Sequence, residues 1–188
     1  ASLVSVLGVD AANGSGNGQF RWVDGGVEVS VEGLIYSRPD GYWERVITGH
    51  VSPMMAGAKG DGWTDDSAAI ERAFRFAAKN NVPLDGEGRI YKVAVKPDVN
   101  DYNKFPKIIR GFNFFCDNEI GLLTLWAGGS SRKRSKMIIE ECTFWGSGVT
   151  NKESANDSYR FLNTRFINLT VRNCKFVGCQ TISCGLGY

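Results

Sequence analysis

Three segments in the second half of the chain resemble one another, and they constrain the fold more than any other feature. Residues 109–114 are Ile-Arg-Gly-Phe-Asn-Phe, residues 139–144 are Ile-Glu-Glu-Cys-Thr-Phe, and residues 171–176 are Val-Arg-Asn-Cys-Lys-Phe. The copies therefore begin 30 and 32 residues apart. Self-similarity at such a period is typical of a solenoid, in which each copy forms one coil and stacking buries its inner face. The repeats predict a repeating β structure after residue 100.

The pattern inside each repeat predicts which side chains point inward. Neighbouring side chains of a strand point to opposite faces, so a turn residue before Cys142 or Cys174 is expected to switch the inward face of the coil. Stacking then places Phe114, Phe144 and Phe176 over one another in a ladder inside the solenoid. Cys142 and Cys174 are expected to form a second ladder.

The cysteines number five, which does not suit a regular disulfide framework. The last three are evenly spaced, but the chain has a single histidine, His50, and no Cys-x2-Cys pair that would suit a zinc site. Buried free thiols are the favoured interpretation, a zinc site is the alternative, and no cofactor is expected. The five residues are Cys116, Cys142, Cys174, Cys179 and Cys184.

Residues 57–70 combine a glycine turn, a cluster of acids and the start of a helix, in the sequence Gly-Ala-Lys-Gly-Asp-Gly-Trp-Thr-Asp-Asp-Ser-Ala-Ala-Ile. Apolar residues at helical spacing predict a helix from near Asp66 to Asn80 and Asn81, with acids in its first turn. The spacings of an EF-hand and of phosphate-binding glycine loops are both missing, so a turn with a helix cap is favoured over a calcium or phosphate loop. The residues of this structural motif are Gly57, Gly60, Asp61, Gly62, Asp65 and Asp66.

The chain before this motif has the alternation of a small β module. Short strands are expected at residues 3–7, 19–23, 27–32, 34–36 and 42–46. Residues 27–32 place three valines on one face, which indicates a half-buried strand. Three aromatic residues are expected to fill the core of the module, with stacking on sugar rings as the alternative: Trp22, Tyr42 and Trp43.

Composition limits the classes of partner. The 188 residues carry a net charge of +2, which gives no general attraction to nucleic acid or to an anionic membrane. No apolar run approaches the roughly 20 residues that span a bilayer, so no membrane insertion is expected. The first ten residues lack the basic start and long apolar core of a signal peptide.

Residues 57–70 resemble the opening motif of the pectate-lyase-like superfamily, whose members include polysaccharide lyases, glycosidases and bacteriophage tailspikes. Residues 84–91, Leu-Asp-Gly-Glu-Gly-Arg-Ile-Tyr, resemble the strand and turn that follow in this family. Residues 18–22 and 41–46 are similar to the segment that precedes the motif in phage tailspikes. The resemblance implies a mostly β fold with a small N-terminal β module, residues 1–50, followed at 51–188 by one capping α-helix and the first coils of a right-handed parallel β-helix.

The resemblance also implies a function. The chain would be the N-terminal portion of a bacteriophage tailspike or tail fibre, located in the virion tail, that anchors a trimeric receptor-binding β-helix. Its expected partners are further copies of itself as a homotrimer, other phage tail proteins through the N-terminal module, and host surface polysaccharide. The alternative is a polysaccharide lyase or glycoside hydrolase, that is, a depolymerase whose catalytic residues lie beyond this stretch.

No catalytic residue is assigned from the sequence. Asp117 and Glu119 share a face if they lie on a strand, and glycosidic cleavage needs two carboxylates about 5 to 10 Å apart. Acids on the outer faces of strands are common, however, so this pair is weak evidence for catalysis. The other acids of the repeats, Glu140, Glu141 and Asp157, are not assigned to catalysis either. Residues 130–136 form a basic loop that is either solvated or meets an acidic polysaccharide or partner subunit, and residues 150–159 form a second loop. Residues 181–186 have the pattern of a further strand, so a longer β-helix is expected.

Overall fold

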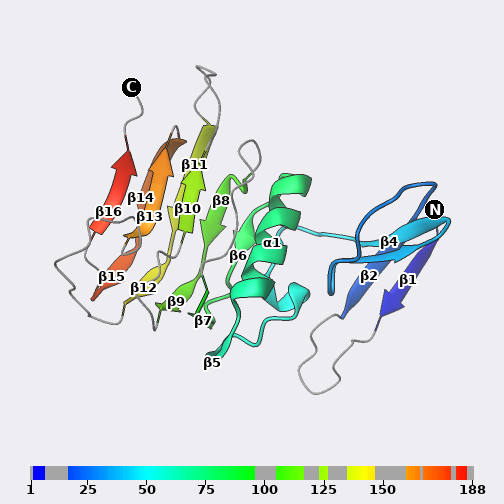
Figure 1. The fold of residues 1–188 in the computed structure, drawn as a ribbon, viewed down its shortest axis with the longest axis horizontal. Helices are drawn as coiled ribbons and strands as arrows, with labels where there is room; N and C mark the ends of the chain where they lie inside the picture. The colour runs from blue at the N-terminus through cyan, green and yellow to red at the C-terminus, as the bar shows by residue number, and fades with distance from the viewer. Residues whose placement is uncertain are drawn as a thin grey trace.

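The computed structural model describes residues 2–6, 17–95, 105–116, 123–126, 135–146, 160–165, 167–178 and 181–185. An antiparallel sheet lies at one end, helix α1 lies in the middle, and stacked parallel strands form the other end (Figure 1). This is the mostly β arrangement with one helix and parallel coils that the sequence predicts. The predicted loop at 150–159, most of the basic loop at 130–136, and Asp117, Glu119 and Asp157 lie outside the described residues.

The N-terminal sheet has the strand order β1-β2-β4-β3, and every pairing in it is antiparallel. Alternation of the side chains predicts these four strands to within a few residues. Trp22 and Trp43 face each other across the sheet, with ring centroids 5.3 Å apart. The strands are Leu3–Val6, Gly18–Asp24, Ile35–Arg38 and Gly41–Arg45.

The predicted strand at residues 27–32 is wrong. Val27 is 99% exposed and Val29 is 81% exposed, and only Val31 makes a bridge, to Ile35. The segment is held to β3 by this one bridge and by two bonds that involve side chains, because Ser37 donates its N–H to Ser30 Oγ at 3.0 Å and its hydroxyl to a backbone carbonyl in the same segment. Alternating valines alone therefore do not make a strand here.

Helix α1, Ser67–Asn80, follows the 3₁₀-helix η1, Pro53–Ala56, and strand β5, Asp61–Asp65. Its buried face is the one predicted by the helical spacing, with Ser67 and Phe76 added. The helix ends at Asn81, which adopts the left-handed conformation (φ 55°) and donates its N–H to the carbonyls of the last turn. The predicted helix and its C-terminal residue are confirmed.

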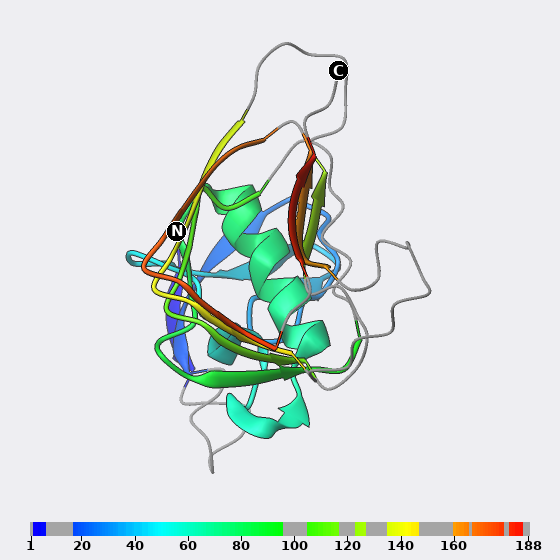
Figure 2. The ribbon, with the colours of Figure 1, turned by 90° about the vertical axis from the view of Figure 1, so that its left-hand side faces the viewer.

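Three parallel sheets form the coils, and Figure 2 shows them around a roughly triangular section with α1 behind them. One sheet has the order β14-β11-β8-β6, with bounds Ile167–Arg172, Ser135–Glu140, Ile108–Arg110 and Leu84–Asp85. The second has the order β15-β12-β9-β7-β5, in which the first four strands are Lys175–Val177, Thr143–Trp145, Asn113–Cys116 and Ile90–Val93.

The third sheet has the order β10-β13-β16, and the sequence repeats did not reveal it. Its strands are Leu123–Trp126, Arg160–Arg165 and Thr181–Gly185. The last of these is the further strand predicted at residues 181–186. Three strands per coil account for part of the length that the repeats assign to loops.

The register of the coils confirms the aromatic ladder. Phe144 pairs with Phe114 on one side and with Phe176 on the other. The ring centroids are 5.4 Å and 4.8 Å from that of Phe144, and both pairs are stacked.

Cys116, Cys142 and Cys174 are free thiols, and burial raises the pKa of Cys142 to about 12. All three are therefore confirmed as free thiols, and Cys116 and Cys142 as buried ones, while Cys174 is partly buried.

One turn position recurs in three successive coils. Gly111, Glu141 and Asn173 precede the inward residues Phe112, Cys142 and Cys174, and all three have a positive φ, at 66°, 55° and 52°. Side chains other than glycine and asparagine rarely adopt this conformation, so Glu141 is strained. This is the turn that the sequence predicts before Cys142 and Cys174. It shifts by one residue the alternation of inward-facing and outward-facing side chains along the coil.

Substitutions at two positions of this turn should affect the free energy of unfolding differently. We expect Gly111→Ala to lower the free energy of unfolding by about 1–2 kcal/mol, because alanine is strained at positive φ. A Cβ at Gly111 would also lie 2.9 Å from Asp85 Oδ1. Glu141→Gly should raise the free energy of unfolding slightly, or leave it unchanged. The substitution relieves strain in the folded state, but glycine also increases the conformational entropy of the unfolded chain. Urea titration checks both, and an equal loss in the two variants would contradict the strain argument.

A ladder of alternating charge runs along the outside of the first sheet. The register aligns Asp85 with Arg110, Arg110 with Glu140, and Glu140 with Arg172. Arg110 Nε lies 2.6 Å from Asp85 Oδ2, and Arg172 Nη2 lies 2.5 Å from Glu140 Oε2. The two carboxylates are mostly covered while the arginines are more exposed, so the ladder fixes the register of neighbouring coils more than it adds stability.

The hydrophobic core continues from the N-terminal half into the coils. Leu34 and Ile35 belong to the same cluster as the buried face of α1 and the aromatic ladder up to Phe144. Helix α1 therefore covers the open end of the coil stack. A division of the chain at residue 50 stays a prediction. In the part of the chain that the structure describes, no helix has the length and apolarity needed to cross a membrane.

Candidate functional site

Asp66 lies at the junction between the glycine turn and α1, and it is 2% exposed. Its carboxylate accepts the N–H of Lys59 at 2.7 Å and the N–H of Gly60 at 3.0 Å. It occupies the N-cap position without bonding to the helix with its side chain. Burial raises the pKa of Asp66, and the two backbone hydrogen bonds only partly oppose that effect. The carboxylate thus folds the glycine turn back onto the start of the helix.

The other two acids of the motif also bind the backbone. Asp61 accepts the N–H of Trp63 and that of Thr64, each at 2.8 Å, and these bonds lower its pKa. Asp65 accepts from the N–H and the hydroxyl of Ser67 and from the N–H of Ala94. Burial acts to raise the pKa of Asp65, but these hydrogen bonds outweigh it and lower the pKa.

All of the acids in this motif precede the helix. The first turn of α1 holds no acidic residue, so the expected interaction of acids there with the helix dipole is wrong. Gly57, Gly60 and Gly62 all have a positive φ, and they allow the chain to turn between η1, β5 and the helix. The six motif residues therefore lie together at one junction. We propose that their role is to hold backbone.

Two of the described acids of the coils face partners within the chain. Asp85 and Glu140 each bind an arginine of the next coil, and Glu141 is exposed at its turn. Among the described residues, no group of three or more metal-binding side chains is found. No described pair of carboxylates is therefore assigned to catalysis.

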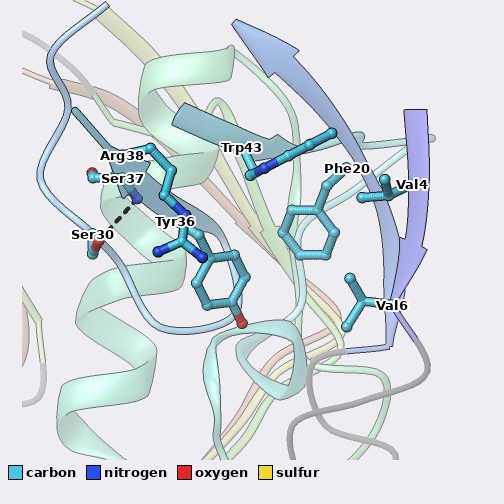
Figure 3. A pocket seen from close by; sticks show the side chains of 8 residues that line it. All are labelled: Val4, Val6, Phe20, Ser30, Tyr36, Ser37, Arg38 and Trp43. Carbon is cyan, nitrogen blue, oxygen red and sulfur yellow. Dashed lines mark hydrogen bonds between the residues drawn. The ribbon is translucent and has the colours of Figure 1, made fainter. Parts of the chain in front are cut away.

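A pocket on the N-terminal sheet is the better candidate for a binding site. It has a volume of about 460 Å³ and lies on the face that carries Val4 and Phe20 (Figure 3). Tyr36 and Trp43 form the other apolar wall, and Arg38 is the charged residue at its rim. The alternation of β1, β2, β3 and β4 brings these side chains to one face because the strands are antiparallel and in register.

Two polar atoms close to this face have no hydrogen-bond partner among the described residues. They are Tyr36 Oη and Arg45 Nη2, both of which are buried. Arg45 lies over the Phe20 ring at 5.1 Å, and its other nitrogens donate to backbone carbonyls of Gly33 and Asn17. Burial lowers the pKa of Arg45. A buried guanidinium with these neutral partners favours a nearby negative group.

The sequence identified only part of this site. Trp43 was predicted to fill the core or to stack on sugar, and the structure places it on the pocket wall. Tyr42 packs against the core, while Trp22 contacts Trp43. Arg38 and Arg45 were not singled out. Alternation along β4 would have placed Arg45 on the face of Trp43, but only the fold shows that it is 5% exposed.

Residues 58–106 match the family model described as the N-terminal extension of bacteriophage endosialidase. A search of curated protein sequences finds no match. Among solved structures, the tailspike protein of Acinetobacter baumannii phage AM24 matches 95% of this chain with a TM-score of 0.65 at 16% identity. Pantoea stewartii WceF, described as a glycan biofilm modifying enzyme with a tailspike-like parallel β-helix fold, matches 93% with a TM-score of 0.55 at 16% identity.

These matches confirm the fold that the sequence resemblance predicts. The chain has the parallel β-helix architecture of tailspike proteins. It spans 30% of the phage AM24 protein and 26% of WceF. The family-model match begins within the junction motif and extends into the coils, so it falls on the segment that links the two ends of the structure.

Proposed function

We propose that this chain is the N-terminal portion of a bacteriophage tailspike and is located in the virion tail. The observation that carries the proposal is the match of residues 58–106 to the endosialidase N-terminal extension, on a chain whose fold matches a phage tailspike over 95% of its length. In this proposal the N-terminal sheet attaches the protein to the tail, and α1 closes the end of a β-helix directed away from it.

The finer parts of the proposal concern assembly and recognition. We infer that three copies associate as a homotrimer and that the β-helix recognises a host surface polysaccharide. The partners of the N-terminal sheet would be other phage tail proteins. The exposed apolar residues on the outer surface of the coils, which include Ile90 and Val177, support contacts with further chains.

A second candidate function is depolymerisation of that polysaccharide. WceF favours it, because that protein is described as an enzyme that modifies a glycan biofilm and shares the fold. Catalytic residues would then lie outside the described part of the chain. Incubation of the full-length product with host capsule or lipopolysaccharide tests this function, and a shorter polymer is the expected result. Unchanged polymer size would count against it.

Immunogold labelling of phage particles tests the location. Antibodies raised against this chain should place gold at the tail in negative-stain images, and particles from a phage that lacks the gene should remain unlabelled. Gold confined to the head, or absent from intact particles that contain the protein by mass spectrometry, would contradict the proposed location.

A further inference from the structure

Strand β1 forms an open edge of the N-terminal sheet. The strand order β1-β2-β4-β3 places it on the outside, and no described strand pairs with its other side. The opposite edge is different, because the segment before β3 bonds to Ser37 and bridges to Ile35. An unpaired edge with apolar side chains is a template for another strand, and Leu3 is 64% exposed and Val4 is 40% exposed.

The hydrogen-bond pattern identifies which groups of β1 are available. Trp22 donates its N–H to Ser2 O, and bonded pairs alternate along an antiparallel ladder. Val4 therefore bonds toward β2, while the N–H and C=O groups of Leu3 and Ser5 point to the open edge. An added strand would take its backbone hydrogen bonds from these two residues.

The pocket continues the same edge. Val4 and Val6 of β1 form its outer wall, with Phe20 and Trp43 behind them (Figure 3). Alternate side chains of a strand added beside β1 would lie on this face. The pocket, at about 460 Å³, has room for at least one large apolar side chain of that strand.

The charged residues near the pocket indicate which kind of residue lies beside the apolar one in the incoming strand. Arg38 lies at the rim of the pocket. Arg45 is buried over the Phe20 ring, and one of its nitrogens has no hydrogen-bond partner in the described part of the chain. No described carboxylate forms a salt bridge with either arginine. An acidic residue in the incoming strand would complement the charge of Arg38 at the rim.

We propose that β1 and the adjoining pocket bind an extended segment of another tail protein, in which an apolar residue is close to an acidic one. The segment adds to β1 as a strand, its apolar side chain enters the pocket, and its carboxylate meets Arg38. Backbone bonds to Leu3 and Ser5 supply affinity, while the pocket and the arginine supply specificity. This inference rests on the proposed attachment of the chain to a phage tail.

The test uses particles assembled without this protein and the full-length product added back. Ser5→Pro removes an N–H that points to the open edge while leaving the bonds to β2 intact, and proline is tolerated on edge strands. Ser5→Ala is its matched control. Arg38→Glu reverses the charge at the rim, and Lys175→Glu makes the same change at an exposed site on β15. Binding is measured by co-sedimentation, and the mass in solution is measured by light scattering.

The wild type, Ser5→Ala and Lys175→Glu should bind particles equally, while Ser5→Pro and Arg38→Glu should bind at least ten-fold more weakly with unchanged melting temperatures. If all variants bind like the wild type, attachment stands and strand addition at β1 is wrong. If Ser5→Pro instead lowers the mass in solution, the occupant is a second copy of this chain and the proposal falls. If the wild type fails to bind particles, the proposed attachment function itself falls.

Discussion

Replacing Phe144 with alanine should lower the free energy of unfolding by about 3–5 kcal/mol, among the largest losses for a single change in this chain. Phe144 is fully buried and stacks on Phe114 and Phe176, so truncation leaves a cavity between two coils. The neighbouring rings can close this cavity only by moving whole coils. Urea denaturation at fixed protein concentration measures the effect.

Lys175→Ala is the control for this change, because Lys175 lies in the neighbouring coil with its side chain exposed. It should change the free energy of unfolding by less than about 0.5 kcal/mol. A similarly small loss for Phe144→Ala would show that the ladder is not a packed core, and the described coil register would then be wrong.

The second large effect is expected for Asp66→Ala, at about 2–4 kcal/mol of unfolding free energy. The carboxylate is buried and accepts two backbone N–H groups, from Lys59 and Gly60, that lose their partner in the variant. The glycine turn would then separate from the start of α1, and the end of the coil stack would open. Hydrogen exchange should show faster exchange in residues 57–66 than elsewhere.

Asp66→Asn separates the role of charge from that of shape. The raised pKa of Asp66 means that the folded state binds its proton more tightly than the unfolded state does. The stability of the wild type relative to Asp66→Asn should therefore decrease as pH rises from the ordinary value of 3.8 through the raised pKa, and then level off. A relative stability that increases over that range would contradict the dominance of burial.

The features that could be predicted from the sequence are those with a local period. Helical spacing identified α1 and its end at Asn81, and the repeats identified the stacked phenylalanines. In these cases one segment contains the whole signal. The three acids of the junction were also found, because glycine and aspartate concentrate there, although their exact partners depend on contacts with Lys59 and Ala94.

The features that were missed depend on register between distant segments. The charge ladder from Asp85 to Arg172 appears only when four strands are aligned. The failed strand at residues 27–32 has the right alternation, but Val27 and Val29 have no sheet face to cover. The pocket likewise needs β1, β2 and β4 side by side, so that Val4 and Trp43 reach one cavity.

The central claim is that this chain begins the β-helix of a tailspike and joins it to the virion tail. A cryo-electron microscopy reconstruction of the tail tests it most directly. The account predicts density at the tail for three copies of the described fold, with the N-terminal sheet against the tail and the coils pointing outward. Tail density that accommodates no parallel β-helix, or one whose coils face the tail while the N-terminal sheet is free, would contradict it.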